Sequence, residues 1–215
     1  DMTRLNEFAA RRAIARLGQP PAEDGFADSK HTLPTIVNAA YSSDHNNIEI
    51  PAAFLQPPFY DPKADAAVNY CTLGAVIGHE ITHGFDSTGR LFDANGALRD
   101  WWSEADGKAF IARSKPLVEQ ANAYEVLPGV HLNGELSSGE NLADIGGVML
   151  GYEALQTRLK AHPEDNRRID GFTPQQRCFL AWAQNWADKM HPGLLRMLAA
   201  SDPHPPGVYR MVAPT

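Results

Sequence analysis

Two histidines and a glutamate in one short stretch have the types and spacing of a metal-dependent hydrolytic site. The stretch reads His79-Glu80-Ile81-Thr82-His83. Residues four apart lie on the same face of a helix, so both imidazole rings can reach one ion. Zinc accepts such nitrogens at about 2.0–2.1 Å. Glu80, about 100° further round the helix, can take a proton from a water molecule that the ion makes acidic. The motif therefore predicts a zinc site with Glu80 as the general base.

The residues around this motif are apolar, which predicts a helix over residues 67–85 that is buried in a core. Leu73, Val76 and Ile77 precede the first histidine, and Ile81 lies between the two. A histidine pair in such a helix needs polar partners, and a metal ion would supply one. The alternative is a buried helix that carries two histidines for unrelated reasons.

A third protein ligand must come from elsewhere, because catalytic zinc usually has three together with an open position. The candidates are Glu140, His131, His204 and Asp86. Asp86 follows His83 by three residues and is better placed to orient that ring. Glu140 and Asp144 lie four apart on one predicted helical face, so one can bind the metal while the other orients a ligand. This spacing favours Glu140, but Glu140 also has capping-box spacing from Ser137.

The elements that must position these residues are mostly helical. Apolar periodicity, capping residues and turn signals predict two strands in a hairpin over 35–41 and 47–50, and further helices over 5–17, 103–124, 137–159 and 173–190. Pro116 should kink or break the helix predicted over 103–124. The chain is therefore expected to have an α+β fold that is mostly helical.

Length and composition describe an ordinary soluble globular protein of one large domain or two small ones. The chain has 215 residues, of which 43% are apolar and 21% are charged. Its net charge of −7 disfavours a nucleic-acid-binding surface, and no cluster of Lys and Arg contradicts this. No apolar run approaches the roughly 18 residues of a membrane span, and the chain opens with no signal peptide.

The two cysteines do not show whether the protein works in a reducing or an oxidising compartment. Cys71 and Cys178 could pair, but two thiols do not make a disulfide framework. Both lie in apolar stretches that are expected to be helical. Buried free thiols are therefore the favoured interpretation.

Several motifs along nearly the whole chain match one known family in order. They occupy residues 37–39, 41–42, 55–59, 76–86, 100–102, 131–134 and 139–147, followed by His204 with Arg210. On these residues the chain resembles the catalytic part of the neprilysin-like zinc endopeptidases, family M13. The resemblance implies a thermolysin-like zincin catalytic domain over 1–215, with an edge strand beside the active-site helix.

The resemblance also implies the roles of individual residues. One zinc ion would be held by His79, His83 and Glu140, with Glu80 as the general base. Asp144 and Asp86 would orient the ligand histidines. Asn38 and Ala39 would bind the substrate backbone as an added strand. His204 would stabilise the oxyanion, and Arg210 would hold a substrate carbonyl. The apolar pocket for the side chain after the scissile bond would be lined by Phe54, Phe59, Val76 and Trp186.

The chain departs from the family in length and in cysteine content. Family members are usually much longer, with an upstream helical domain that covers the cleft, so this domain is expected to pack against such a segment. Extracellular animal members use several disulfides, which points here to a bacterial-type relative that is periplasmic or secreted.

The predicted function is zinc-dependent hydrolysis of peptide bonds in oligopeptides, with an apolar residue preferred after the scissile bond. One alternative is a zinc-stabilised binding module without catalysis, and another is a fragment that is inactive alone. The presence of Glu80, His204 and Arg210 together argues against the binding module, because a structural zinc site needs none of them.

Overall fold

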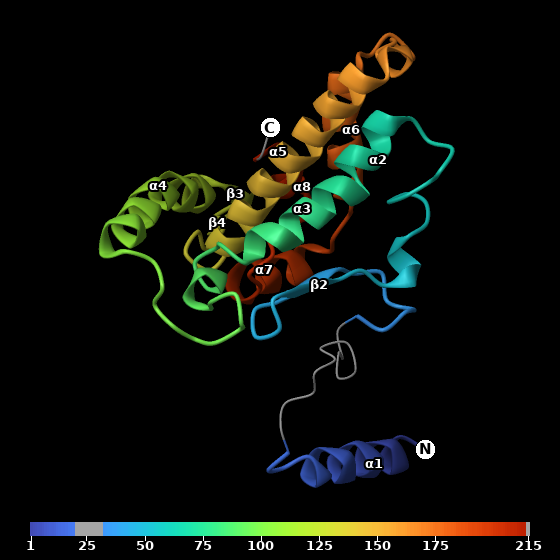
Figure 1. Ribbon diagram of the computed structural model, residues 1–215. Coiled ribbons are helices and arrows are strands. Elements are labelled where there is room, and N and C mark those ends of the chain that lie inside the picture. The colour runs from blue at the N-terminus through green and yellow to red at the C-terminus, as the bar shows by residue number, and fades with distance from the viewer. Residues whose placement is uncertain (20–31, 214–215) are drawn as a thin grey trace.

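Helices dominate the computed structural model, which describes residues 1–19 and 32–213 (Figure 1). The helices are α1 (Met2–Ala15), α2 (Ala66–Cys71), α3 (Leu73–His83), α4 (Glu104–Ala123), α5 (Ser138–Ala161), α6 (Pro174–Asn185), α7 (Pro192–Ser201) and α8 (Gly207–Val212). Short 3-10 turns are η1 (Ala52–Phe54), η2 (Gly89–Leu91) and η3 (Pro163–Asp165). Two antiparallel pairs join β1 (Ala40–Ser42) to β2 (Asn47–Glu49), and β3 (Glu125–Leu127) to β4 (Val130–His131). The predicted α+β class with mostly helical content is confirmed.

Helices α3 and α5 run side by side through the middle of the domain, at backbone contact distance (Figure 1). Glycines on α5 make this approach possible. A Cβ on Gly147 would lie 2.4 Å from the carbonyl oxygen of Ala75, and one on Gly151 would lie 3.2 Å from the amide nitrogen of the same residue. Any larger side chain would force the two helices apart. The packing therefore fixes the helix that carries the histidine pair against the helix that carries Glu140.

The predicted single helix over 67–85 is wrong, because α2 and α3 are separate helices that meet at Thr72. The Thr72 hydroxyl donates to the carbonyl oxygen of Phe59 at 2.6 Å, and the Leu73 amide donates to the same oxygen at 3.2 Å. Thr72 has φ −103° and ψ −91°, outside the helical region. A carbonyl from a neighbouring loop thus replaces the helical hydrogen bond at this point.

The interpretation of the two cysteines as free thiols is also wrong, since Cys71 and Cys178 form a disulfide. The bond joins α2 to α6 across 107 residues of sequence and brings the two Cα atoms to 5.1 Å. Both residues are fully buried, beside Ala67, Leu155 and Leu159. The apolar surroundings were predicted correctly, but they belong to a disulfide in the core.

Pro116 does not break its helix, and one helix ends earlier than predicted. Helix α4 contains Pro116 without ending there, because proline removes only one main-chain hydrogen bond and α4 packs on α5 and β4. Helix α6 begins with the capping box of Thr173 and Gln176, but it ends at Asn185, five residues before the expected end at 190. At this end Trp186 packs against Trp182, and the chain turns away.

The β1–β2 hairpin lies beside α3, as the edge-strand prediction required, although both strands are shorter than expected. Elsewhere, one small core cluster joins Ala75, Val148 and Trp182 beneath α3 and α5.

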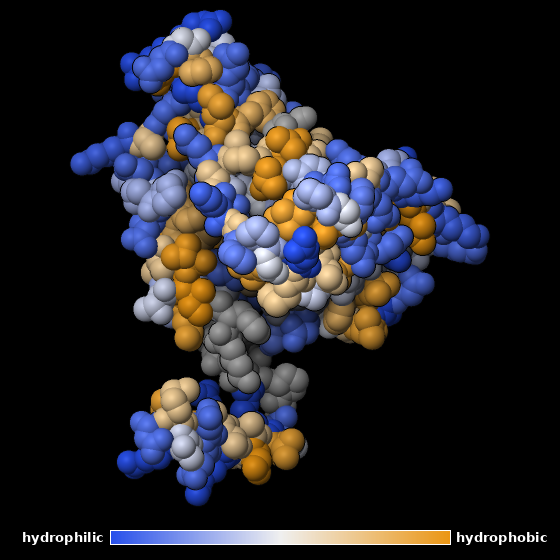
Figure 2. Space-filling view, turned by 180° about the vertical axis from the view of Figure 1, so that it is seen from behind, coloured by the Kyte–Doolittle hydropathy of each residue, from blue (hydrophilic) through white to orange (hydrophobic). Residues whose placement is uncertain are grey.

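In the described part of the chain α1 has no buried residue, and Figure 2 shows its hydrophobic side chains at the bottom of the view. None of the described helices has the length and apolar character needed to cross a bilayer.

Candidate metal centre

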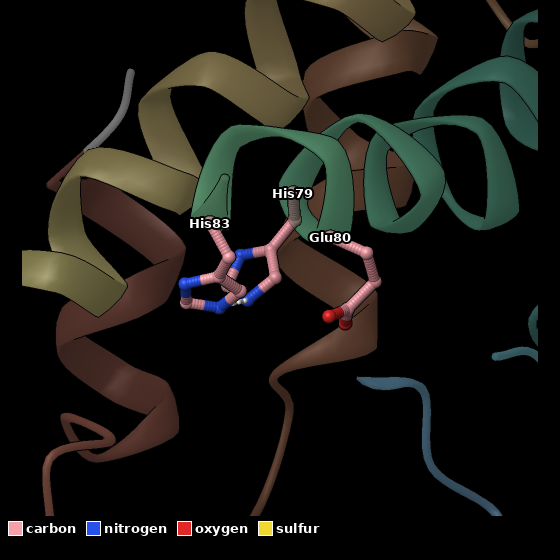
Figure 3. A group of neighbouring side chains, drawn as sticks. All are labelled: His79, Glu80 and His83. Atoms are coloured by element: carbon pink, nitrogen blue, oxygen red, sulfur yellow. Dashed lines mark hydrogen bonds between the residues drawn. The ribbon is translucent and has the colours of Figure 1, made fainter. Parts of the chain in front are cut away.

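His79 and His83 leave the same side of α3 and bring their ring nitrogens together (Figure 3). Their Nε2 atoms are 3.0 Å apart, and the rings meet edge to face with centroids 4.6 Å apart. The Glu80 carboxylate lies beside them, and one donor atom from each of the three residues lies within 4.8 Å of the others. One turn of helix thus supplies two ring nitrogens that could bind one ion, and an adjacent carboxylate.

Glu140 approaches this pair from the first turn of α5. Its Oε2 is 3.4 Å from His79 Nε2, and its Oε1 is 3.5 Å from His83 Nε2. The capping alternative does not hold, because among the described residues the Ser137 side chain makes no capping bond to α5. The Ser137 hydroxyl donates instead to the carbonyl oxygen of Asn133 at 3.1 Å. The Glu140 carboxylate is therefore free to face the two rings.

These three donors fit a zinc ion in both kind and spacing. The two ring nitrogens are 3.0 Å apart, and the Glu140 oxygens lie 3.4 and 3.5 Å from them. Four donors placed tetrahedrally about 2.0–2.1 Å from zinc are about 3.4 Å from one another. Two imidazoles and one carboxylate are also a donor set that catalytic zinc uses. The residues present therefore fit the ion that the motif predicts.

A carboxylate behind each ring fixes its orientation. His79 Nδ1 lies 2.9 Å from Asp144 Oδ1, and His83 Nδ1 lies 2.8 Å from Asp86 Oδ2. A carboxylate accepts a hydrogen bond, so each Nδ1 carries a proton, and in the neutral ring each Nε2 is left with a lone pair for an ion. The backbone amides of residues 88 and 89 donate to the other Asp86 oxygen, which holds that carboxylate in place.

The buried charges shift the acidity of the site residues. Burial lowers the pKa of His79, but hydrogen bonds with Asp144 and Glu140 outweigh it and raise this pKa to about 9. Burial raises the pKa of Glu140, yet the hydrogen bond from His79 and the nearby cations bring it down to about 2. Burial also raises the pKa of Glu80 above its ordinary value. Glu140 is thus held as a carboxylate, while Glu80 is shifted towards the range that suits a general base.

A cleft of about 540 Å³ opens over the metal centre and gathers the predicted site residues. Besides the centre itself, its walls include Asn38, Ala39, Phe54, Phe59, Val76, Asp86, Trp186, His204 and Arg210. Asp144 does not line the cleft, because it lies behind His79 and is only 1% exposed. His131, one of the candidate ligands, is exposed on β4 and lies outside the cleft.

His204 and Arg210 occupy different environments in this cleft. The His204 side chain is 57% exposed, with Nε2 3.3 Å from Glu140 Oε1 and Nδ1 2.8 Å from Asp202. Arg210 is buried, and its guanidinium lies 3.6 Å above the Trp186 ring. Its carbonyl oxygen accepts a hydrogen bond from the Trp182 indole. His204 can therefore reach a ligand from the rim, whereas Arg210 forms part of the wall.

Several polar residues of the cleft were not predicted from the sequence, among them Ser43, Thr88 and Asn185. Asn185 lines the cleft together with Trp182 and Trp186. The three residues have i, i+3, i+4 spacing, which places them on one face of α6 and its last turn. That spacing is the signal in the sequence that could have identified Asn185.

Known proteins resemble this chain in both sequence and structure. The model of peptidase family M13 matches residues 38–215. Neprilysin-2 of Drosophila melanogaster is 41% identical over 210 residues, and human neprilysin is 39% identical over 210 residues. The alignments cover 97% and 96% of this chain, but only 27% of each relative. The crystal structure of Mycobacterium tuberculosis zinc metalloprotease Zmp1 with an inhibitor superposes with a TM-score of 0.86 at 42% identity, covering 94% of this chain and 31% of that one.

Proposed function

The chain belongs to peptidase family M13, and on this basis we propose that it carries the catalytic centre of a zinc-dependent endopeptidase acting on oligopeptides. The observation that supports the proposal most directly is the convergence of His79, His83 and Glu140 beside the buried carboxylate of Glu80. The chain spans 27% of the length of the curated relatives it matches, so the activity of the whole protein is part of the proposal.

His79, His83 and Glu140 would hold the ion. Zinc bound by these residues would polarise a scissile carbonyl and make a water molecule acidic. Glu80 accepts the proton of the attacking water and passes it to the leaving amine. Burial raises the pKa of Glu80 above its ordinary value, which favours acceptance of that proton.

The remaining predicted residues would bind and orient the peptide. Asn38 and Ala39 precede β1 on the cleft wall, where their backbone groups can pair with an extended substrate. His204 would donate to the oxyanion from the rim. Arg210 would hold a substrate carbonyl through those guanidinium N–H groups that its contacts within the protein do not use.

An apolar pocket in the same cleft would take the side chain after the scissile bond. Phe54 and Phe59 stack with centroids 4.2 Å apart, and Val76 and Trp186 line the same cleft. Aromatic and aliphatic walls favour an apolar residue there.

The rival function is a zinc-stabilised binding module. The position of Glu80 argues against it, because a buried carboxylate beside the ligands costs free energy and a structural site has no use for it.

One substitution separates the two functions. Glu80→Gln keeps the size of the side chain and removes its basicity, so zinc content should stay normal while peptide hydrolysis falls by at least about 10²-fold. Glu153→Gln, on the exposed face of α5, is the matched control. Normal hydrolysis by the Glu80 variant, or chelator-insensitive hydrolysis by the unaltered chain, would refute the proposal.

We also propose that the protein works in an oxidising compartment, periplasmic or extracellular. The buried disulfide between Cys71 and Cys178 supports this location, since disulfides persist outside the reducing cytosol. Fractionation of the native host would test it, and recovery of the protein in the cytosol would contradict it.

Finally, we propose that a helical segment of the same protein, outside these 215 residues, packs on this domain. The length of the relatives supports it, as do large apolar side chains that stand half-exposed, such as Phe85 and Trp101. Size-exclusion chromatography of the 215-residue chain should show association through these surfaces. A stable, fully active monomer would contradict the packing.

A further inference from the structure

Two N–H groups in the cleft wall at the end of α6 are buried without a partner. Asn185 Nδ2 and Trp186 Nε1 have no hydrogen-bond acceptor among the residues that the structure describes. Both residues line the cleft over the metal centre. Buried polar groups are nearly always paired in native proteins, so an unpaired group in a binding cleft points to a partner that arrives with a ligand or with water.

The two groups differ in what they can do. The Trp186 ring is fixed between Trp182 and the Arg210 guanidinium, so its N–H cannot turn. The Asn185 amide ends in a torsion between sp³ and sp² atoms, which is broad and changes at little cost. A rotation of this amide would present the buried Nδ2 to the cleft. Asn185 is therefore the group that can meet an acceptor on a bound peptide.

The surroundings of Asn185 define the shape of such a ligand. Phe54, Phe59, Val76 and the Trp186 ring provide apolar walls in the same cleft. A wholly apolar side chain that fills this space offers the Asn185 amide no acceptor, so its N–H group stays buried and unpaired. A side chain with an apolar stem and a neutral acceptor at its end satisfies both the walls and the amide.

We propose that Asn185 is a specificity-determining residue that makes this pocket accept glutamine-like side chains, with an unbranched stem and a terminal carbonyl, after the scissile bond. The inference rests on the proposed function, because it assigns the pocket to that substrate residue. It also modifies the apolar preference, since the amide of Asn185 interrupts the apolar lining.

The test uses binding, so it does not depend on turnover. Two peptide hydroxamates are compared on the zinc-loaded 215-residue chain by calorimetry. They differ only in the side chain that enters the pocket, which is glutamine in one and norleucine in the other. Norleucine has a similar unbranched length and no acceptor. The measured quantity is the ratio of the norleucine Kd to the glutamine Kd.

Asn185→Leu keeps the shape of the side chain and removes its polar atoms, so the Kd ratio should fall by about 5–10-fold, the usual worth of one neutral hydrogen bond. Asn185→Asp removes the donor and keeps the acceptors, so the ratio should fall there as well. Gln184→Leu is the control, because Gln184 is the adjacent exposed amide and lies outside the cleft lining. Its ratio should equal that of the unaltered chain.

The possible results distinguish this inference from the proposed function. An unchanged ratio in both Asn185 variants would overturn the role of Asn185. If the Asn185 variants change the Kd ratio but the unaltered zinc-loaded chain cleaves neither of the corresponding peptides, the proposed activity would be overturned. The role of Asn185 in binding the side chain would still stand. If neither hydroxamate binds the zinc-loaded chain, both the function and the inference fail.

Discussion

Arg210 and Asp144 form a buried, two-pronged ion pair behind the metal centre. Arg210 donates from Nε to Asp144 Oδ2 at 2.8 Å and from Nη2 to Asp144 Oδ1 at 2.6 Å. Asp144 Oδ1 is also the atom that accepts the hydrogen bond from His79. The carboxylate that orients one proposed zinc ligand is therefore itself held by an arginine from α8, which gives Arg210 a structural task besides any contact with substrate.

Loss of this pair should destabilise the fold. Arg210→Met leaves the Asp144 charge buried with His79 as its remaining partner, and breaking a buried pair in this way costs about 3–5 kcal/mol. Urea unfolding with chelator present measures the effect without a contribution from bound metal. Arg158→Met is the control, because the Arg158–Asp165 pair is partly exposed and should contribute about 0–1 kcal/mol. If Arg210 serves substrate binding alone, the free energy of unfolding will not change.

Removal of Glu140 should abolish tight zinc binding, since Glu140→Ala takes a charged ligand from the centre. Zinc content after dialysis, measured by atomic emission, checks this. Ser137→Ala should retain normal zinc, because the Ser137 hydroxyl caps nothing in α5. Asp144→Ala should weaken zinc affinity by about 10–100-fold, the usual effect of losing a carboxylate that orients a histidine ligand. Equal zinc content in the Glu140 and Ser137 variants would remove Glu140 from the ligand set.

A methyl group at Gly147 should separate the two central helices. Its Cβ would lie 2.4 Å from the carbonyl oxygen of Ala75 and 2.8 Å from the amide nitrogen of His79, both of which are backbone atoms. Gly147→Ala should therefore cost about 1–3 kcal/mol of unfolding free energy and weaken zinc affinity as α3 shifts. Gly107→Ala in α4 is the control, because its Cβ meets nothing within 4 Å. Equal stability of the two variants would contradict the tight packing.

Removal of His204 should affect turnover rather than folding. The ring is largely exposed, so His204→Ala should leave the melting temperature unchanged. Turnover should fall by roughly 10²-fold with little change in KM, as expected for a contact made mainly in the transition state. His162→Ala, which removes a partly exposed histidine outside the cleft, controls for general effects. A rise in KM with unchanged turnover would instead assign His204 to ground-state binding.

Reduction of the disulfide should destabilise the domain. The bond closes a loop of more than one hundred residues, and loss of a native disulfide typically costs about 2–5 kcal/mol. Urea unfolding of the Cys71→Ser, Cys178→Ser variant measures the cost. Reductant should then destabilise the unaltered chain to a similar extent and leave the double variant unaffected. Equal stability of the oxidised and reduced chains would contradict the contribution of the bond.

Local patterns predicted the kinds of element better than their limits. The capping box at Thr173 and the capping serine at Ser103 both begin helices in the structure, because each depends on hydrogen bonds within one turn. The division of one predicted helix at Thr72 was not predictable in this way. It depends on the carbonyl oxygen of Phe59, which reaches Thr72 from thirteen residues away.

The sequence by itself determined the chemistry of the centre. His79, Glu80 and His83 lie within five residues, so helix geometry alone brings their side chains to one side. The tertiary structure decided the rest. Spacing left Glu140 with two possible roles, and the packing of α5 on α3 turned it towards the histidines. The two cysteines pair across a long stretch of sequence, and so do Arg210 and Asp144, while α6 meets residues of the cleft that lie far from it in the chain. Local periodicity carries no information about contacts between such distant segments.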